Sequence, residues 1–311
     1  MGAIISSGAL EWGMQLPIQS QSSLYVQPWE RSATPADLAA VSQAADRGGA
    51  FYVAVCDHVA IPDDRVEAMG ATWYDTIATL GWLAAQTERV NLLSHVYVAP
   101  YRHPLVAAKS FATLDVLSHG RAILGVGIGH VEAEFEQLGV PFRTRGKALD
   151  AALPVLREAL ATGRYDGAVI EPRSLRPDGP PIWVGGSSDA ALRRAATLAD
   201  GWLPQGPPPM GFRGAIELLH RTRAEVGLDA AFDVGMMAGS VYLGEADWAL
   251  PEHTTATADP GELAAKLARF CSIGANQLQV RFAARSSAEM CEQIERFGAE
   301  VWPEVQHLVV G

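Results

Sequence analysis

The sequence predicts a (β/α)8 barrel, in which eight parallel strands form a closed barrel surrounded by helices. Apolar runs and helical patterns alternate eight times along the 311 residues, which is the order that this fold requires. Polar residues follow most of the apolar runs directly, as they do at the functional end of such a barrel. No Pro/Gly/Ser-rich linker divides the chain, so we expect residues 1–311 to form a single domain.

Eight segments are predicted as strands because they are short, apolar and rich in β-branched or aromatic residues. They cover residues 12–18, 51–57, 90–98, 121–129, 182–186, 201–205, 234–244 and 277–283.

The helices follow these strands in alternation. Thr34 is the expected N-cap of the first helix, Pro35 occupies its first position, and Leu38, Val41 and Ala45 share one face. Further helices are predicted over 73–86, 104–117, 145–161, 192–199, 215–226, 263–270 and 290–301. The loops 59–72, 163–181 and 245–258 remain, and we expect them to shape the substrate pocket.

A doubly wound open sheet is the competing fold class. That fold normally carries a glycine-rich phosphate loop at its first turn from strand to helix. Here the corresponding stretch is "LPIQSQSSLYVQPWE", which contains no glycine. The sequence therefore favours the closed barrel.

Composition excludes several function classes. The net charge is −11 and no Lys/Arg cluster interrupts it, so nucleic acid and anionic membrane surfaces are poor partners. No window of 18 apolar residues and no signal-peptide pattern occurs. The three cysteines form no CxxC motif, as expected for reduced thiols. We expect a cytoplasmic protein that acts on a small molecule.

The stretch "GVGIGH" places Gly125, Gly127 and Gly129 at alternate positions of a strand. A dinucleotide fingerprint, G-x-G-x-x-G, would need its third glycine at position 130, where the chain has His130. Glycines at alternate positions leave one face of the strand bare, so that a flat ligand could lie against it. The alternative is that they only make room for packed layers inside the barrel.

Histidines stand at the predicted strand ends. His58 follows Asp57 directly after the second strand, and His130 follows the fourth. A histidine there can exchange a proton with a reacting ring or carbonyl. The plainer interpretation of His58 is a loop histidine hydrogen-bonded to Asp57. His95, Gln205 and Arg281 also lie at strand ends.

The stretch "WVGGSSDAALRRAA" is the candidate phosphate site. Two glycines end a strand, and Ser187 or Ser188 caps the following helix, so exposed backbone amides and the helix dipole favour an anion. An ordinary N-cap is the alternative. No H-E-x-x-H motif, first-strand His-x-His pair or G-x-S-x-G elbow occurs, so we expect no metal site and no serine nucleophile. These features together indicate a bound organic cofactor.

With these motifs in place, the sequence resembles the bacterial luciferase-like flavin- or deazaflavin-dependent oxidoreductases, from about Trp12 to Arg281. The strongest stretches are "FYVAVCDHVAIP", "LAAQTERVNLLSHVYVAPYRHPLVAAKSFATLDVLSHGRAILGVGIGHVEAEFEQLGV" and "PIWVGGSSDAALRRAATLADGWLP". The resemblance implies a (β/α)8 barrel, usually a homodimer, that holds FMN or coenzyme F420 at the carboxyl ends of its strands. The Asp57–His58 pair is similar to that of the F420-dependent branch.

The resemblance also implies roles for residues. Asp57 and His58 would lie near the deazaflavin ring, and the third strand would carry a cis peptide bond behind it, at His95–Val96 or at the bond before it. Gly127, Ile128 and Gly129 would pass along the ring and ribityl chain, and Gly185, Gly186 and Ser187 would bind the phosphate. His58 and His130 are the candidate proton carriers, although the family's sugar-phosphate dehydrogenases have a glutamate where this chain has His130.

Three functions follow as hypotheses. The first is a coenzyme F420-dependent oxidoreductase that transfers a hydride between the deazaflavin and a small organic substrate. The second is an FMN-dependent monooxygenase built on the same barrel. The third, from another class, is a flavin-binding protein without catalytic activity.

Overall fold

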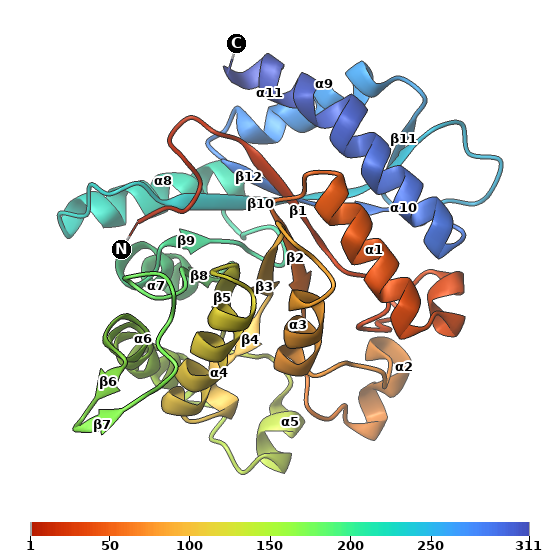
Figure 1. Cartoon of the computed structure of the whole chain (residues 1–311). Helices are drawn as coiled ribbons and strands as arrows, with labels where there is room; N and C mark the ends of the chain where they lie inside the picture. The colour runs from red at the N-terminus through yellow and green to blue at the C-terminus, as the bar shows by residue number, and fades with distance from the viewer. Residues whose placement is uncertain (1, 311) are drawn as a thin grey trace.

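Eight parallel strands close into a barrel in the order β1-β2-β3-β5-β8-β9-β10-β12, with β12 paired again to β1 (Figure 1). The computed structural model describes residues 2–310. The strands are β1 (Glu11–Gln15), β2 (Tyr52–Val55), β3 (Asn91–Ser94), β5 (Ala122–Gly127), β8 (Ile182–Val184), β9 (Gly201–Trp202), β10 (Asp233–Leu243) and β12 (Gln277–Phe282). The barrel predicted from the alternating pattern is confirmed.

Helices cover the outside of the barrel (Figure 1). Helix α1 begins at Pro35 as predicted, and the backbone N–H of Thr34 donates to Asp37 Oδ2 at 2.8 Å. The helices are α1 (Pro35–Arg47), α2 (Val66–Met69), α3 (Thr76–Ala84), α4 (Pro104–Leu117), α5 (Glu132–Gln137), α6 (Arg145–Thr162), α7 (Asp189–Leu198), α8 (Gly211–Glu225), α9 (Pro260–Cys271), α10 (Ser287–Arg296) and α11 (Trp302–Val310). A π-helical stretch, Phe297–Val301, joins α10 to α11.

Two apolar layers hold the barrel together. The larger lies between the strands and the helices, and the smaller fills the barrel interior around Tyr52 and Trp183. The rings of these two residues meet edge to face, with their centroids 5.7 Å apart. A Cβ at Gly13 would lie 2.6 Å from the Tyr52 ring, and one at Gly201 would lie 2.6 Å from Trp183. Glycine at these two positions therefore leaves space for the large rings of Tyr52 and Trp183, which fill the barrel interior.

The predicted third strand, 90–98, is interrupted. The chain forms β3 and then the two-residue β4 (Tyr97–Val98), and the peptide bond between His95 and Val96 separates them in the cis form. Strand β4 pairs with β5 beyond the point where β3 stops. The cis bond lies at the position that the family resemblance implied.

Loop 163–181, which we expected near the substrate pocket, lies at the opposite end of the barrel. It contains the hairpin of β6 (Arg164–Tyr165) and β7 (Ala168–Val169). Arg176 Nε donates to the carbonyl of Gly120 at 2.8 Å, in the turn that precedes β5. Because α6 returns the chain to the amino ends of the strands before β8 begins, this loop cannot reach the carboxyl end. The prediction for this loop is wrong.

A further strand appears in the region that we predicted as loop 245–258. Strand β11 (Thr254–Thr257) pairs in parallel with the second half of β10. Strand β9 pairs with β10 only at Asp233 and Val234, so the rest of that edge is available for pairing. The threonines of β11 suit a strand, but the segment is too short to be recognised by its pattern.

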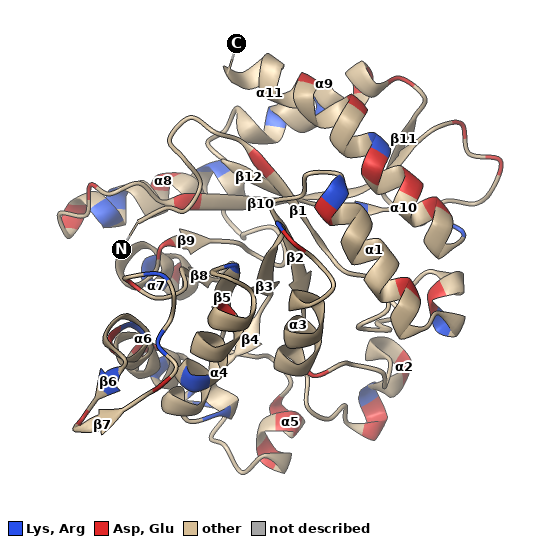
Figure 2. Ribbon diagram, in the orientation of Figure 1, with Lys and Arg blue, Asp and Glu red and all other residues tan. Residues whose placement is uncertain are grey.

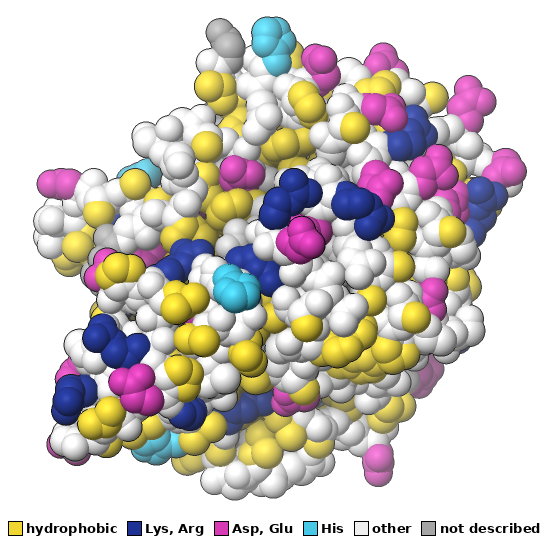
Figure 3. Space-filling view, viewed as in Figure 1, with side chains coloured by type: hydrophobic (Ala, Val, Ile, Leu, Met, Phe, Trp, Pro, Cys, Tyr) yellow, Lys and Arg dark blue, Asp and Glu magenta, His cyan; other side chains and the backbone are white. Residues whose placement is uncertain are grey.

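Charged side chains lie mainly on the outer helices and the loops, and few lie on the barrel strands (Figure 2). On the face shown in Figure 3, Lys and Arg side chains lie beside Asp and Glu side chains, with apolar patches between them. Among the residues that the structure describes, no helix is both long enough and apolar enough to cross a membrane.

Candidate active site

The predicted site residues gather at the carboxyl ends of four neighbouring strands. His58 follows β2, the His95–Val96 bond follows β3, His130 follows β5 and Gly186 follows β8. These strands are adjacent in the order β2-β3-β5-β8. Parallel strands present their carboxyl ends at the same end of a barrel, where the active sites of this fold lie.

His58 has a fixed position at this end of the barrel. Its Nδ1 lies 2.9 Å from Glu134 Oε2, and only 10% of its side chain is exposed. The Trp73 ring meets it edge to face with a centroid distance of 4.4 Å, and the perpendicular His130 ring lies 5.7 Å away. The interpretation of His58 as bound to Asp57 is wrong, because Glu134 is its partner.

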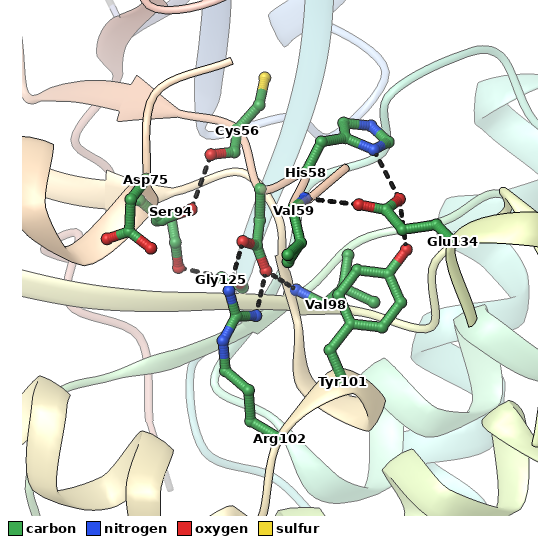
Figure 4. A network of polar contacts seen from close by, with 12 residues as sticks. Cys56, His58, Val59, Asp75, Ser94, Val98, Tyr101, Arg102, Gly125 and Glu134 are labelled. Atoms are coloured by element: carbon green, nitrogen blue, oxygen red, sulfur yellow. Dashed lines mark hydrogen bonds and ion pairs between the residues drawn. The ribbon is translucent and has the colours of Figure 1, made fainter. Parts of the chain in front are cut away.

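Glu134 is the centre of a polar network that the sequence analysis missed (Figure 4). One oxygen accepts from His58 and from the Tyr101 hydroxyl, at 2.7 Å from the latter, and the other accepts from the backbone N–H groups of Val59 and Ala60. Burial would raise the pKa of Glu134, but the hydrogen bonds from His58, Tyr101 and Val59 lower it to about 2.

The charge of Glu134 sets the tautomer of His58. An ionised carboxylate only accepts hydrogen bonds, so Nδ1 of His58 must carry a proton and donate it to Glu134. The other ring nitrogen, Nε2, is then the atom that can exchange a proton with a bound molecule. Glu134 lies four residues beyond His130, on helix α5 inside the loop after β5.

Asp57 has a structural partner at the same end of the barrel. Its carboxylate is buried and forms a two-pronged ion pair with Arg102, with N–O distances of 2.6 and 2.9 Å. It also accepts the backbone N–H of Val98 at 2.8 Å. Asp57 thus connects the end of β2 to β4 and to the segment after it, and its acceptor atoms are occupied.

His95 lies inside the barrel and is 1% exposed. Its Nε2 lies 3.1 Å from the carbonyl of Leu203, and its Nδ1 lies 3.1 Å from Gln279 Nε2. Burial lowers the pKa of His95 to about 4, so the ring is neutral near pH 7. Gln205 Nε2 donates to the His95 carbonyl at 2.8 Å and so helps to fix the cis peptide bond.

The alternate glycines of β5 face this cis segment. A Cβ at Gly127 would lie 2.4 Å from Val96 Cγ2, and one at Gly185 would lie 2.5 Å from Val96 Cγ1. A Cβ at Gly129 would lie 2.7 Å from Val98 Cγ1. The main role of the bare face of β5 is therefore to make room for Val96 and Val98 of the third-strand segment. A ligand at the mouth would meet Val96, which is half-buried between these glycines.

The chain after β8 has the geometry of an anion site. Gly186 has φ +97° and is exposed, and the backbone amides of Gly186 and Ser187 donate to no acceptor among residues 2–310. Ser187 Oγ donates to the Gly206 carbonyl at 2.6 Å, and Ser188, not Ser187, caps α7 through the N–H of Ala191. A Cβ at Gly186 would lie 3.1 Å from that of Ala191, so a glycine keeps this cradle open. The arrangement fits a phosphate.

A cavity lies next to these residues. It has a volume of about 850 Å³, opens between β1, β10 and β12 and is covered by residues from the loops 20–30 and 248–253. Ser20, which lines it, pairs with Trp73, whose ring touches His58. Residues 248–253 of the loop 245–258 thus line a cavity, and so does the loop after β1, which the sequence analysis did not single out.

His130 is exposed at the mouth of the barrel, next to His58. Partial burial of its ring is the main cause that lowers the pKa of His130, and the proximity of His58 and of Arg145 adds to it. Its neutral form therefore prevails near pH 7. Within residues 2–310, no group of three or more His, Cys, Asp and Glu side chains could hold a metal ion.

Comparisons with known proteins bear on this site. Residues 10–309 match the family described as luciferase-like monooxygenase. An uncharacterized protein of Mycobacterium tuberculosis is 35% identical over 186 residues, which are 57% of this chain and 64% of that protein, so the match spans less than two thirds of that relative. The 5,10-methylenetetrahydromethanopterin reductase of Methanopyrus kandleri is 26% identical over 216 residues, covering 62% of this chain and 58% of that protein.

Solved structures share the fold. The coenzyme F420 dependent tetrahydromethanopterin reductase from Methanopyrus kandleri has a TM-score of 0.72 and 20% identity, over 96% of this chain and 99% of that chain. Monooxygenase RslO1 from Streptomyces bottropensis has a TM-score of 0.73 and 17% identity, over 94% and 99%. An F420-dependent secondary alcohol dehydrogenase in complex with an F420-acetone adduct has a TM-score of 0.71 and 18% identity, over 96% and 99%. At these identities the likeness establishes the barrel.

Proposed function

The chain belongs to the luciferase-like monooxygenase family, and from this premise we propose that it is a coenzyme F420-dependent oxidoreductase acting on a small organic substrate. The observation that carries the proposal is the ordered His58 beside the cis His95–Val96 segment, with Glu134 holding Nδ1 and leaving Nε2 for a reaction partner. F420, when bound, exchanges a hydride with the substrate.

The residues that would hold the cofactor come from the ends of four strands, β2, β3, β5 and β8. Val96, half-buried between Gly127 and Gly185, would support one face of the ring. The free amides of Gly186 and Ser187 would bind the phosphate at the start of α7. Asp57 would act indirectly, by fixing the segment after β4 through Arg102 and Val98.

His58 would move the proton that accompanies a two-electron reaction. Glu134 stabilises the form of His58 in which Nδ1 is protonated, and it also stabilises the positive charge that appears when Nε2 accepts a proton. His130, with its ring 5.7 Å away, would relay the proton to solvent, because it is neutral near pH 7 and exposed. Trp73 covers the edge of His58 and limits the access of water.

Parallel fluorescence titrations of the protein with F420 and with FMN test the proposal. We expect F420 to bind more tightly than FMN. Gly186→Val should weaken F420 binding, because the added side chain fills the amide cradle. Gly227→Val is the matched control, since Gly227 also has a positive φ, +70°, but lies in the turn after α8.

Either of two results would contradict the proposal. Tight binding of FMN without binding of F420, together with oxygen consumption by the reduced complex, would assign the FMN-dependent monooxygenase activity instead. Failure of both cofactors to bind the wild-type protein would remove the cofactor assignment altogether.

A further inference from the structure

Strand β12 carries polar side chains into the barrel at alternate positions, Gln277, Gln279 and Arg281. Arg281 is the last of these and lines the cavity of about 850 Å³ at the mouth. An arginine is costly to bury without a negative partner, because its charge loses the stabilisation of water. The contacts of Arg281 therefore indicate what the cavity binds.

The guanidinium of Arg281 has few partners in the protein. Nη2 donates to Gln15 Oε1 at 2.8 Å, and Nε is buried without an acceptor among the described residues. No carboxylate oxygen of residues 2–310 lies within 4.0 Å of its nitrogens. The Tyr25 ring covers one face, with its centroid 3.4 Å from Cζ, and leaves the in-plane edge for hydrogen bonds.

Glu30 is the acidic residue whose charge acts on Arg281, but its oxygens are occupied. They accept the backbone N–H groups of Ile18 at 2.8 Å and Gln27 at 2.9 Å, which fixes the loop after β1. Glu30 therefore offsets part of the positive charge of Arg281 without accepting a hydrogen bond from it. Burial of the guanidinium outweighs this effect and lowers the pKa of Arg281.

A second arginine on the cavity wall provides a contrast. Arg285 is exposed and paired, with Nη2 2.8 Å from Glu289 Oε1 and Nη1 3.1 Å from Asp247. Its charge is compensated by the protein itself. Of the two arginines, only Arg281 has no carboxylate partner among the described residues, so its charge is left for a ligand.

The remaining wall combines apolar side chains with polar ones, among them Ser20, Ser23, Ser240, Glu252 and His253. Trp29 and Trp248 line the cavity, and each has a buried indole N–H without an acceptor among the described residues. Among the described lining residues, Arg281 is the third with a buried unpaired nitrogen, and none has a buried unpaired oxygen. These three nitrogens are covered by protein atoms, whereas Nη1 of Arg281 is neither buried nor hydrogen-bonded. A ligand with a negatively charged oxygen would satisfy this donor and its charge.

We propose that this cavity binds a small organic anion, with a flat apolar body between Trp29 and Trp248 and its acidic group on Arg281. The inference rests on the proposed function, because it identifies the cavity as the substrate pocket beside His58 and assigns the substrate to the class of organic acids. It uses the half of the mouth formed by β1, β10 and β12, whereas the cofactor residues lie on β2, β3, β5 and β8.

Two fluorescent probes that differ only in their charge test the proposal. 8-Anilinonaphthalene-1-sulfonate carries an anionic group, and N-phenyl-1-naphthylamine has the same ring system without it. We expect the sulfonate probe to bind the wild-type protein more tightly. Arg281→Gln should weaken its binding by about tenfold or more and leave the neutral probe unchanged, since a hydrogen-bonded charge pair is lost.

Control variants separate charge from shape. Arg281→Lys keeps the positive charge and should retain part of the preference for the sulfonate. Arg285→Gln removes a charge that is already paired and should leave both probes unaffected. Equal affinity of wild type and Arg281→Gln for the sulfonate, or an equal loss of both probes, would overturn the proposal.

The cofactor proposal is tested separately by an F420 titration of the same variants. Arg281→Gln should bind F420 as the wild type does, because Arg281 lies outside the cofactor residues. If the wild type binds no F420 while its sulfonate preference depends on Arg281, the anion site stands and the cofactor proposal fails. If F420 binds and the sulfonate preference is absent, only the anion site fails.

Discussion

Replacing Glu134 with glutamine removes the negative charge at the centre of the His58 network and nearly preserves the shape of the side chain. In the wild type, this buried carboxylate accepts four hydrogen bonds, from His58, Tyr101, Val59 and Ala60. A glutamine offers one acceptor oxygen, and its NH₂ group must face the donors that met the second oxygen.

The cost of this change can be worked out from the pKa of Glu134. Burial would raise this pKa from its usual 4.5, but the hydrogen bonds of His58, Tyr101 and Val59 lower it to about 2. One pKa unit corresponds to about 1.4 kcal/mol, so the ionised carboxylate contributes about 3 kcal/mol to the free energy of unfolding near pH 7. This contribution is complete above pH 4.5 and is lost as the pH falls towards 2.

Urea denaturation at several pH values measures this contribution. Glu134→Gln should lower the free energy of unfolding by about 3 kcal/mol at pH 7, and the deficit should shrink by about 1.4 kcal/mol per pH unit below pH 4.5. Glu136→Gln is the matched control, since Glu136 is exposed on the same helix and should show no deficit. A deficit of Glu134→Gln that is independent of pH would refute the reasoning.

The same variant tests the tautomer of His58. In the wild type, Nδ1 of His58 donates to the ionised Glu134, so nitrogen NMR of labelled histidine should show the proton on Nδ1. In Glu134→Gln, the amide NH₂ can donate to Nδ1, and the proton should move to Nε2. An unchanged tautomer would mean that Glu134 does not position the ring.

Three more substitutions have definite expected outcomes. Asp57→Asn breaks the buried ion pair with Arg102 and should lower the free energy of unfolding by about 3 kcal/mol or more; stability equal to wild type would contradict this. Gly127→Ala should cost about 1–3 kcal/mol, because its Cβ would lie 2.4 Å from Val96 Cγ2. Val96→Ala in the same chain should relieve that cost, and a melting curve without relief would rule out the contact. His58→Ala should reduce substrate turnover by about a hundredfold or more, well beyond its effect on stability; full turnover would exclude His58 from the reaction.

Much of the barrel could be predicted from the sequence because its signals are local. The Thr34–Pro35 start of α1 and the bounds of α4 follow from capping and periodicity, and the structure reproduces both. The position of His58 and His130 directly after predicted strands likewise predicts that both lie at one end of the barrel. Their ring centroids lie 5.7 Å apart in the structure.

What the sequence did not predict depends on contacts between distant segments. Glu134 belongs to a six-residue helix inside a loop, and only the folded chain shows that it contacts His58, 76 residues earlier. The glycines of β5 suggested a bare face, but the occupant of that face, Val96, comes from another strand. The position of loop 163–181 was wrong because composition does not show at which end of the barrel a loop lies.

The position of the cofactor is the central claim, and a crystal structure of the protein soaked with F420 tests it most directly. The account predicts the deazaflavin ring against Val96 and within hydrogen-bond reach of His58 Nε2, with the phosphate on the amides of Gly186 and Ser187. An F420 ring bound in the cavity beside Arg281, away from Val96, would contradict it, as would a mouth that remains free of F420 at saturating concentration.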